Sequence, residues 1–234
     1  MCARVARRYN DAHREGGVSV KKLLTKEFKL ALHPTNIFFV FLALMLMIPN
    51  YPYLVVMFYT CLGIFFLCQS GRENNDVFFT LMLPVRKRRV VLARILTACI
   101  LELMQIAVCI PVSVIKSRLN MPANAADIEA NTAFFGLSFI LFGLFNLVFF
   151  TGYYKNVKRV GVPFLLGSVA VFMFIAAEIV LCHALPLFRD KLDTPDPQFL
   201  TLKLAVLAIG IAAWLLLTLI AYKRSAVLFE KQDI

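Results

Sequence analysis

Residues 132–153 read TAFFGLSFILFGLFNLVFFTGY and contain no charged side chain. An α-helix rises about 1.5 Å per residue, so a stretch of this length crosses the roughly 30 Å hydrocarbon core of a bilayer. Short segments that hold most of the Lys and Arg residues separate this stretch from other apolar ones, and this alternation is typical of membrane spans and their loops. The stretch therefore predicts a transmembrane helix.

The rest of the chain repeats this pattern. Of its 234 residues, 60% are hydrophobic and only 17% are charged, whereas about a quarter of a soluble domain is charged. Five further apolar stretches are predicted to span the membrane, namely 35–48, 53–69, 90–115, 160–185 and 202–222. The predicted fold class is an all-α integral membrane protein with six transmembrane helices. The first predicted span is short, so it must borrow length from the preceding segment or form a tight hairpin with the second.

The distribution of positive charge predicts the orientation. Twenty of the 25 Lys and Arg residues lie before the first span, in 70–94, in 153–159 or after the last span. Positive loops are retained in the cytoplasm, so both termini are predicted to be cytoplasmic. Loop topology also explains the net charge of +11 better than nucleic-acid binding does, because no soluble domain remains to carry a basic face.

The chain divides into four predicted regions. Residues 1–19 form a polar N-terminal extension, and 20–33 an amphipathic helix that lies in the inner headgroup layer. Residues 34–222 form the six-span domain, and 223–234 a cytoplasmic tail. The apolar side chains of the amphipathic helix recur four apart, at Val20, Leu24, Phe28 and Leu32. The alternative is that this segment is a cytoplasmic extension of the first span.

The cytoplasmic loop 71–89 contains a helix signal of its own. Asn74, Asn75 or Asp76 can cap a helix, and Pro84 ends it. Between them lies an apolar stripe over two turns, made by Val77, Phe78, Leu81 and Met82. So short a loop rarely needs such a helix unless the helix docks onto another protein.

Around this helix the chain resembles the permease subunits of ABC-2 type transporters. The second span is followed by an acidic residue, the short helix, a Leu-Pro pair and basic residues, here Glu73, Leu83, Pro84, Arg86 and Arg94. The ending SAVLFEKQDI at 225–234 is similar to the Phe-Glu-Lys-x-Asp tail that often closes these chains. The resemblance covers the chain from about Val20 to its end.

The resemblance implies a membrane unit of two permease subunits, identical or related, whose cytoplasmic loops rest on two ABC ATPase subunits. Helix 76–82 would be the coupling helix, a stiff lever that transmits closure of the ATPases to the spans. The residues that would couple to the ATPase are Glu73, Asp76, Val77, Phe78, Leu81, Met82, Leu83, Pro84 and Arg86. For the basic run 86–89, the alternative is that it only anchors the inner interface.

The energy must come from the separate ATPase. The chain lacks the G-x-x-x-x-G-K-[ST] sequence that cradles nucleotide phosphates, so it is not predicted to be an enzyme by itself. ATP and Mg²⁺ would be bound by the ATPase subunits, and this chain is expected to bind no cofactor or metal of its own.

Three polar residues in the predicted spans are candidates for function. Glu102 and Gln105 lie near the middle of 90–115, where an ionised carboxylate costs about 2.5–3.5 kcal/mol on insertion scales. Glu102 either lines a substrate path or subunit interface, or it is a neutral, hydrogen-bonded core residue. Glu178, towards the outer end of 160–185, forms a pH-sensing pair with His183 or is hydrated at the interface.

Small and aromatic residues make up much of 132–153. Gly136, Gly143 and Asn146 put small and polar atoms on one face, where another helix can approach closely. Most of its seven phenylalanines are predicted to contact lipid, these being Phe134, Phe135, Phe139, Phe142, Phe145, Phe149 and Phe150. The six cysteines have no C-x-x-C pairing and are interpreted as small buried hydrophobes.

Competing functions are an intramembrane enzyme, a passive channel and a membrane anchor for a larger complex. The three histidines, His13, His33 and His183, are too scattered for a metalloprotease site. The channel and the anchor stay open, but neither needs a docking helix. Small permeases of the family export amphipathic or antimicrobial peptides of the phenol-soluble-modulin and lantibiotic type. The function predicted is therefore peptide export across a bacterial plasma membrane, with export of a drug, lipid or polysaccharide as the alternative.

Overall fold

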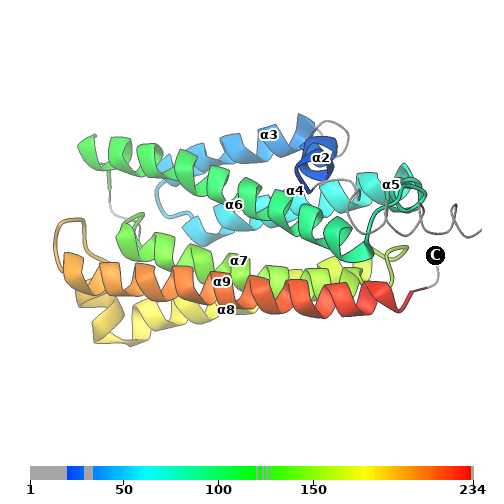
Figure 1. Cartoon of the computed structure of the whole chain (residues 1–234). Helices are drawn as coiled ribbons and strands as arrows, with labels where there is room; N and C mark the ends of the chain where they lie inside the picture. Colours follow the sequence, from blue (N-terminus) through cyan, green and yellow to red (C-terminus); the bar gives the residue numbers. More distant parts are fainter. Residues whose placement is uncertain are drawn as a thin grey trace, which may run out of the picture.

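The computed structural model describes residues 20–28, 34–119, 121–122, 124, 126 and 128–232, and this part of the chain is helical without strands. Figure 1 shows the helices. They are α2 (Val20–Lys26), α3 (Pro34–Phe41), η2 (Leu42–Met47), α4 (Tyr53–Glu73), α5 (Asp76–Leu81), α6 (Lys87–Arg118), α7 (Thr132–Tyr153), α8 (Gly161–Ala184), η3 (Phe188–Leu192) and α9 (Leu200–Glu230).

Five helices are long and apolar enough to cross a membrane: α4, α6, α7, α8 and α9. They coincide with the second to sixth predicted spans, although α6 and α9 run several residues beyond the predicted bounds. α9 continues to Glu230, so most of the predicted tail is helical. The first predicted span corresponds to α3 followed by the 3₁₀ helix η2, which together are shorter than the other five.

The long helices lie side by side and give the molecule two distinct ends (Figure 1). At one end, called here the α5 end, lie α5 and the last turn of α9, and α2 packs against α6 towards this end. At the other, called the far end, lie the connections between α6 and α7 and between α8 and α9. α7 is the central helix, because it packs along α9 and also contacts α4 and α8.

The close approach predicted for one face of α7 is confirmed, and the partner is α9. A Cβ atom on Gly210 would lie only 2.1 Å from the Gly136 carbonyl oxygen. One on Gly143 would lie 3.0 Å from the Trp214 Cα. Further along the same face, the Asn146 side chain donates a hydrogen bond of 3.2 Å to Thr218. Glycine is therefore required where the two backbones meet.

The predicted lipid contact of the α7 phenylalanines is wrong. Six are buried within the protein, and only Phe135 is partly exposed. The reason is the central position of α7, whose aromatic side chains fill the core between its neighbours. The helices with the most exposed apolar surface are α8 and α9. The cysteines of the described residues are buried, as predicted.

The amphipathic segment is helical in its described part, α2. The most buried side chain of α2 is Leu23, and Glu27, just after its end, is buried on the same side. The predicted stripe residues Val20, Leu24 and Phe28 are only partly buried. Residues 1–19 and 29–33, and with them Leu32, lie outside the described residues. The location of this helix in the headgroup layer stays a prediction.

Candidate functional site at the α5 end

The predicted short helix is present as α5. Asn75 precedes it with φ of 50°, in the left-handed region that Asn tolerates better than most residues. This conformation reverses the chain sharply after α4. Asn75 occupies the N-cap position, but its side chain makes no capping hydrogen bond, so the reversal of the backbone and not a side-chain cap starts the helix.

The apolar stripe predicted for this helix divides between two faces. Val77 is buried and Leu81 partly so, whereas Phe78 and Met82 are 48% and 65% exposed. Phe79, which the stripe did not include, is 60% exposed. The face of α5 that packs on the bundle combines the polar Asp76 and Thr80 with Val77 and Leu81. The side chains that face outward are Phe78 and Phe79, followed by Met82 just after the helix.

Arg94 explains the polar inner face of α5. This residue, two turns into α6, has 1% of its surface exposed. Its Nε lies 2.8 Å from Glu27 Oε2, and its Nη2 lies 2.6 Å from Asp76 Oδ2. One guanidinium therefore holds two carboxylates from separate segments.

Lys26 supplies a second cation. Its Nζ lies 2.7 Å from Asp76 Oδ1 and 3.2 Å from Glu27 Oε1, and it donates a 2.9 Å hydrogen bond to Thr80 Oγ1. Lys26, Glu27, Asp76 and Arg94 form what we call the buried ionic cluster, with two positive and two negative groups. The cluster fixes α5 to α6 and to the segment that contains α2.

The cluster also presses against α4. Arg94 Nη1 donates to the Leu67 carbonyl oxygen at 3.3 Å. A Cβ on Gly71 would lie 2.9 Å from the same nitrogen, so a side chain at 71 would displace the guanidinium from this position. α4, α5 and α6 thus meet around Arg94.

The remaining residues predicted to couple lie outside the cluster. Glu73 is exposed and accepts a 2.8 Å hydrogen bond from Gln69 on its own helix. Leu83, Pro84 and Arg86 are also exposed. The acidic groups that bind Arg94 are therefore Asp76 and Glu27, and Glu73 does not take part.

Part of the basic run 86–89 binds the chain's own C-terminal segment. Arg88 makes a bidentate contact with Glu230, with distances of 2.6 and 2.9 Å. Lys87 donates to the Gln232 carbonyl oxygen and lies 5.8 Å from the Phe229 ring centroid. The Phe-Glu-Lys ending is thereby attached to the start of α6.

The intramembrane candidates are core residues in this structure. Glu102 has no exposed surface and accepts a 2.7 Å hydrogen bond from the indole N–H of Trp214 on α9. Gln105, also buried, donates to Cys109 Sγ at 3.5 Å. The arrangement favours the interpretation of Glu102 as a hydrogen-bonded core residue over that of a path-lining one.

At the far end Glu178 is buried as well, so its predicted hydration is wrong. It accepts hydrogen bonds from the Ile128 backbone N–H at 3.3 Å and from Cys182 Sγ at 2.9 Å. His183 Nδ1 lies 2.8 Å from the Ile179 carbonyl oxygen of its own helix. Ile128, from the connection between α6 and α7, therefore lies against α8 beside the Glu178 carboxylate.

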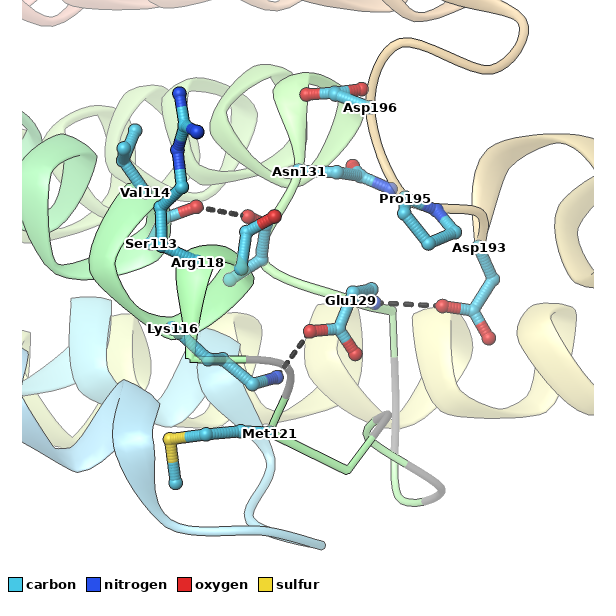
Figure 2. A pocket seen from close by; sticks show the side chains of 12 residues that line it. Ser113, Val114, Lys116, Arg118, Met121, Glu129, Asn131, Asp193, Pro195 and Asp196 are labelled. Carbon is cyan, nitrogen blue, oxygen red and sulfur yellow. Dashed lines mark hydrogen bonds and ion pairs between the residues drawn. The ribbon is translucent and has the colours of Figure 1, made fainter.

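A pocket of about 350 Å³ opens at the far end (Figure 2). Glu129 lies between two of its lining residues: its carboxylate binds Lys116, and its backbone N–H donates to Asp193 Oδ1 at 2.8 Å. Lys116 also donates to Tyr53 Oη at 2.7 Å. Burial raises the pKa of the Asp193 carboxyl above its ordinary value. Two of the charged residues that line the pocket, Lys116 and Glu129, are thus paired with each other.

One feature of the sequence indicates the buried ionic cluster. Arg94 is an isolated cation in the apolar run 90–101, and such a residue needs a partner at membrane depth. Nothing in the sequence indicated that Lys26 and Glu27 supply it. Within the described part of the chain no group of three His, Cys, Asp or Glu side chains is placed to hold a metal ion.

A family model described as ABC-2 family transporter protein matches residues 22–230. Neither a curated protein nor a solved structure matches the chain significantly. Together with the five apolar helices, the family match shows a multi-pass membrane protein. The matched residues include the buried ionic cluster, α5 and the segment attached to Arg88.

Proposed function

The chain belongs to the ABC-2 family of transporter membrane proteins, and on this premise we propose that it is a six-span permease that a separate ABC ATPase drives through α5. Its family works with such an ATPase and is not itself catalytic. In the proposed assembly two permease chains bind two ATPase subunits, and ATP and Mg²⁺ are held by the ATPases.

The observation that carries the proposal is the contrast between the two faces of α5. Its inner face is fixed by the buried ionic cluster, and its outer face exposes Phe78, Phe79 and Met82. Exposed apolar side chains on a rigid helix are typical of a protein contact. A helix held by Arg94 would transmit a displacement to α6 without absorbing it.

The test replaces exposed apolar side chains of α5 and leaves the buried ionic cluster intact. The double variant Phe78→Ser, Phe79→Ser should fold normally and lose the ATPase subunit during purification from the native membrane. Met173→Ser is the matched control, because Met173 is a similarly exposed apolar residue on α8. Retention of the ATPase by the double variant would contradict docking through α5, and absence of an ATPase from the wild-type preparation would favour the channel or the anchor.

The proposed orientation places α5, both termini and the basic loops in the cytoplasm, and α3 with η2 forms the first, short span. Single cysteines at Lys155 and Asp190, in a chain without other reactive cysteines, test it. A membrane-impermeant maleimide added to intact cells should label position 190 and leave position 155 unlabelled. The reverse pattern would contradict the proposal.

The proposed substrate is an amphipathic peptide exported from a bacterial cell. Its support is the resemblance to peptide exporters and the broad apolar surface of α8 and α9, which suits a substrate that enters from the bilayer. ATPase activity of the reconstituted complex should rise with amphipathic peptides and stay at its basal value with a scrambled, non-amphipathic control. Stimulation by a drug or lipid alone would contradict the peptide assignment.

A further inference from the structure

A second cavity, of about 540 Å³, lies beside α5. The end of α4, α5 and the connection between α7 and α8 form its walls. Its lining residues are Gly71, Arg72, Asn75, Val77, Phe78, Phe79, Val157 and Lys158. The pocket therefore adjoins the exposed face of α5 and also involves a second connection at the same end of the molecule.

The residues that line this pocket are of two chemical kinds. Four are apolar, namely Val77, Phe78, Phe79 and Val157. Two are positively charged, namely Arg72 at the end of α4 and Lys158 in the α7–α8 connection. Arg72 has only a loose contact of 4.0 Å with Glu73. Among the ion pairs formed by the described residues, none includes Lys158 or its neighbours Lys155 and Arg159.

We propose that this pocket receives an apolar side chain that projects from the ATPase subunit, with acidic residues of the ATPase on either side facing Arg72 and Lys158. The inference rests on the proposed function and extends it. The docking surface then comprises α5 together with the α7–α8 connection, and the ATPase inserts into the permease at this point.

Two observations favour a protein over an anionic lipid as the occupant. Met82 and Leu83, which follow α5 directly in the chain, add exposed apolar surface, being 65% and 50% exposed, and a lipid headgroup would not cover them. Two cations, Arg72 and Lys158, line the cavity together with apolar side chains, an arrangement that matches the apolar centre and charged rim of a protein interface. Complementary charges at such a rim set the partner's orientation and its association rate.

The experiment introduces a photo-crosslinking phenylalanine analogue into the full chain, in the native membrane, at one of three positions. Position 79 tests α5, position 158 tests the opposite side of the pocket, and position 165 on α8 is the control. We expect positions 79 and 158 to capture the same ATPase, identified by the mass of its P-loop peptide. The peptide attached at position 158 should contain an apolar residue flanked by acidic residues.

A charge reversal provides the quantitative test. Lys158→Glu should reduce the ATPase recovered with the permease about tenfold, because it places like charges together at the rim. Lys155→Glu, an exposed residue of the same connection that does not line the pocket, should change recovery less than about twofold. Replacing the captured acidic residue of the ATPase by Lys should restore binding to Lys158→Glu.

The outcomes separate this inference from the proposed function. Capture of an ATPase at position 79 but not at 158 would overturn the pocket assignment and leave α5 as the docking helix. Capture at neither position would overturn both. Capture of phospholipid at position 158 would identify a lipid site instead. Equal recovery with Lys158→Glu and Lys155→Glu would also overturn the pocket assignment.

Discussion

The α5 end and the far end both bury cations against carboxylates, but the surroundings of the pairs differ. At the α5 end Arg94 is enclosed between Glu27 and Asp76, away from solvent. At the far end Lys116 and Glu129 line a pocket of about 350 Å³. The side chains of the two pairs are buried to a similar degree, at 1% and 15% exposed for Arg94 and Asp76 and 4% and 18% for Lys116 and Glu129. The difference is that the α5-end cluster joins three segments, whereas the far-end pair lies beside a cavity.

Substitution of Arg94 is expected to have the largest effect on stability. Arg94→Leu leaves Lys26 as the one cation of the cluster beside Glu27 and Asp76, and breaking a buried pair in this way costs about 3–5 kcal/mol. We expect a loss of that size in the free energy of unfolding, measured by SDS titration. Arg88→Leu removes the exposed pair with Glu230 and should have a much smaller effect. Similar losses for the two variants would contradict an enclosed cluster.

The two ends are joined by α7 and α9, and Gly210→Ala tests that connection. The added methyl group would meet the Gly136 carbonyl oxygen, and overpacking of this kind costs about 1–3 kcal/mol. Gly161→Ala is the matched control, because no atom lies within 4 Å of a Cβ at that position. We expect thermal melting in detergent to shift only for Gly210→Ala. An unchanged melting temperature would show that the helices can separate locally.

Lys116→Met provides the far-end counterpart of the Arg94 change. Glu129 would lose its cation but keep a 2.7 Å hydrogen bond from the Asn124 backbone N–H and its access to the pocket. We therefore expect a smaller loss, about 1.5 kcal/mol in the same SDS titration. A loss as large as that of Arg94→Leu would remove the distinction between the two ends.

The smallest predicted effect is the pH response of Asp193. Because burial raises its pKa in the folded state, the folded protein binds this proton more tightly than the unfolded chain. Its contribution to stability is then complete below its ordinary pKa of 3.8 and declines as the pH rises through the folded-state value. Asp193→Asn should melt progressively higher than wild type over that pH range. Parallel curves would contradict the prediction, and exposed Asp190 supplies the control variant.

The sequence predicted the positions of the helices better than the contacts that their residues make. Spans two to six and α5 could be located, because hydropathy, Asn75 and Pro84 are local signals. Whether the α7 phenylalanines contact lipid or the protein core could not be predicted, since lipid tails and a protein core are equally apolar and select the same side chains. The pairing of Glu27 with Arg94 joins residues 67 positions apart, and no local pattern records such a contact.

At the candidate site, too, the position of the helix could be predicted from the sequence and its contacts could not. The position of α5 was predictable, but the face that it exposes was not. A six-residue helix with apolar side chains on both sides has no clear amphipathic direction. Here Asp76 and Thr80 face inward because Asp76 binds Arg94 and Thr80 binds Lys26. Which face is buried was decided by two cations from other segments.

The order of the buried ionic cluster along the chain has a consequence for biogenesis. Glu27 and Asp76 both precede Arg94, so the ribosome has completed both carboxylates before the guanidinium emerges. Arg94 therefore meets its neutralising partners as α6 enters the bilayer, and the insertion machinery never has to accommodate that cation alone. A circularly permuted chain that places α6 first would lose this advantage while retaining every contact of the finished protein.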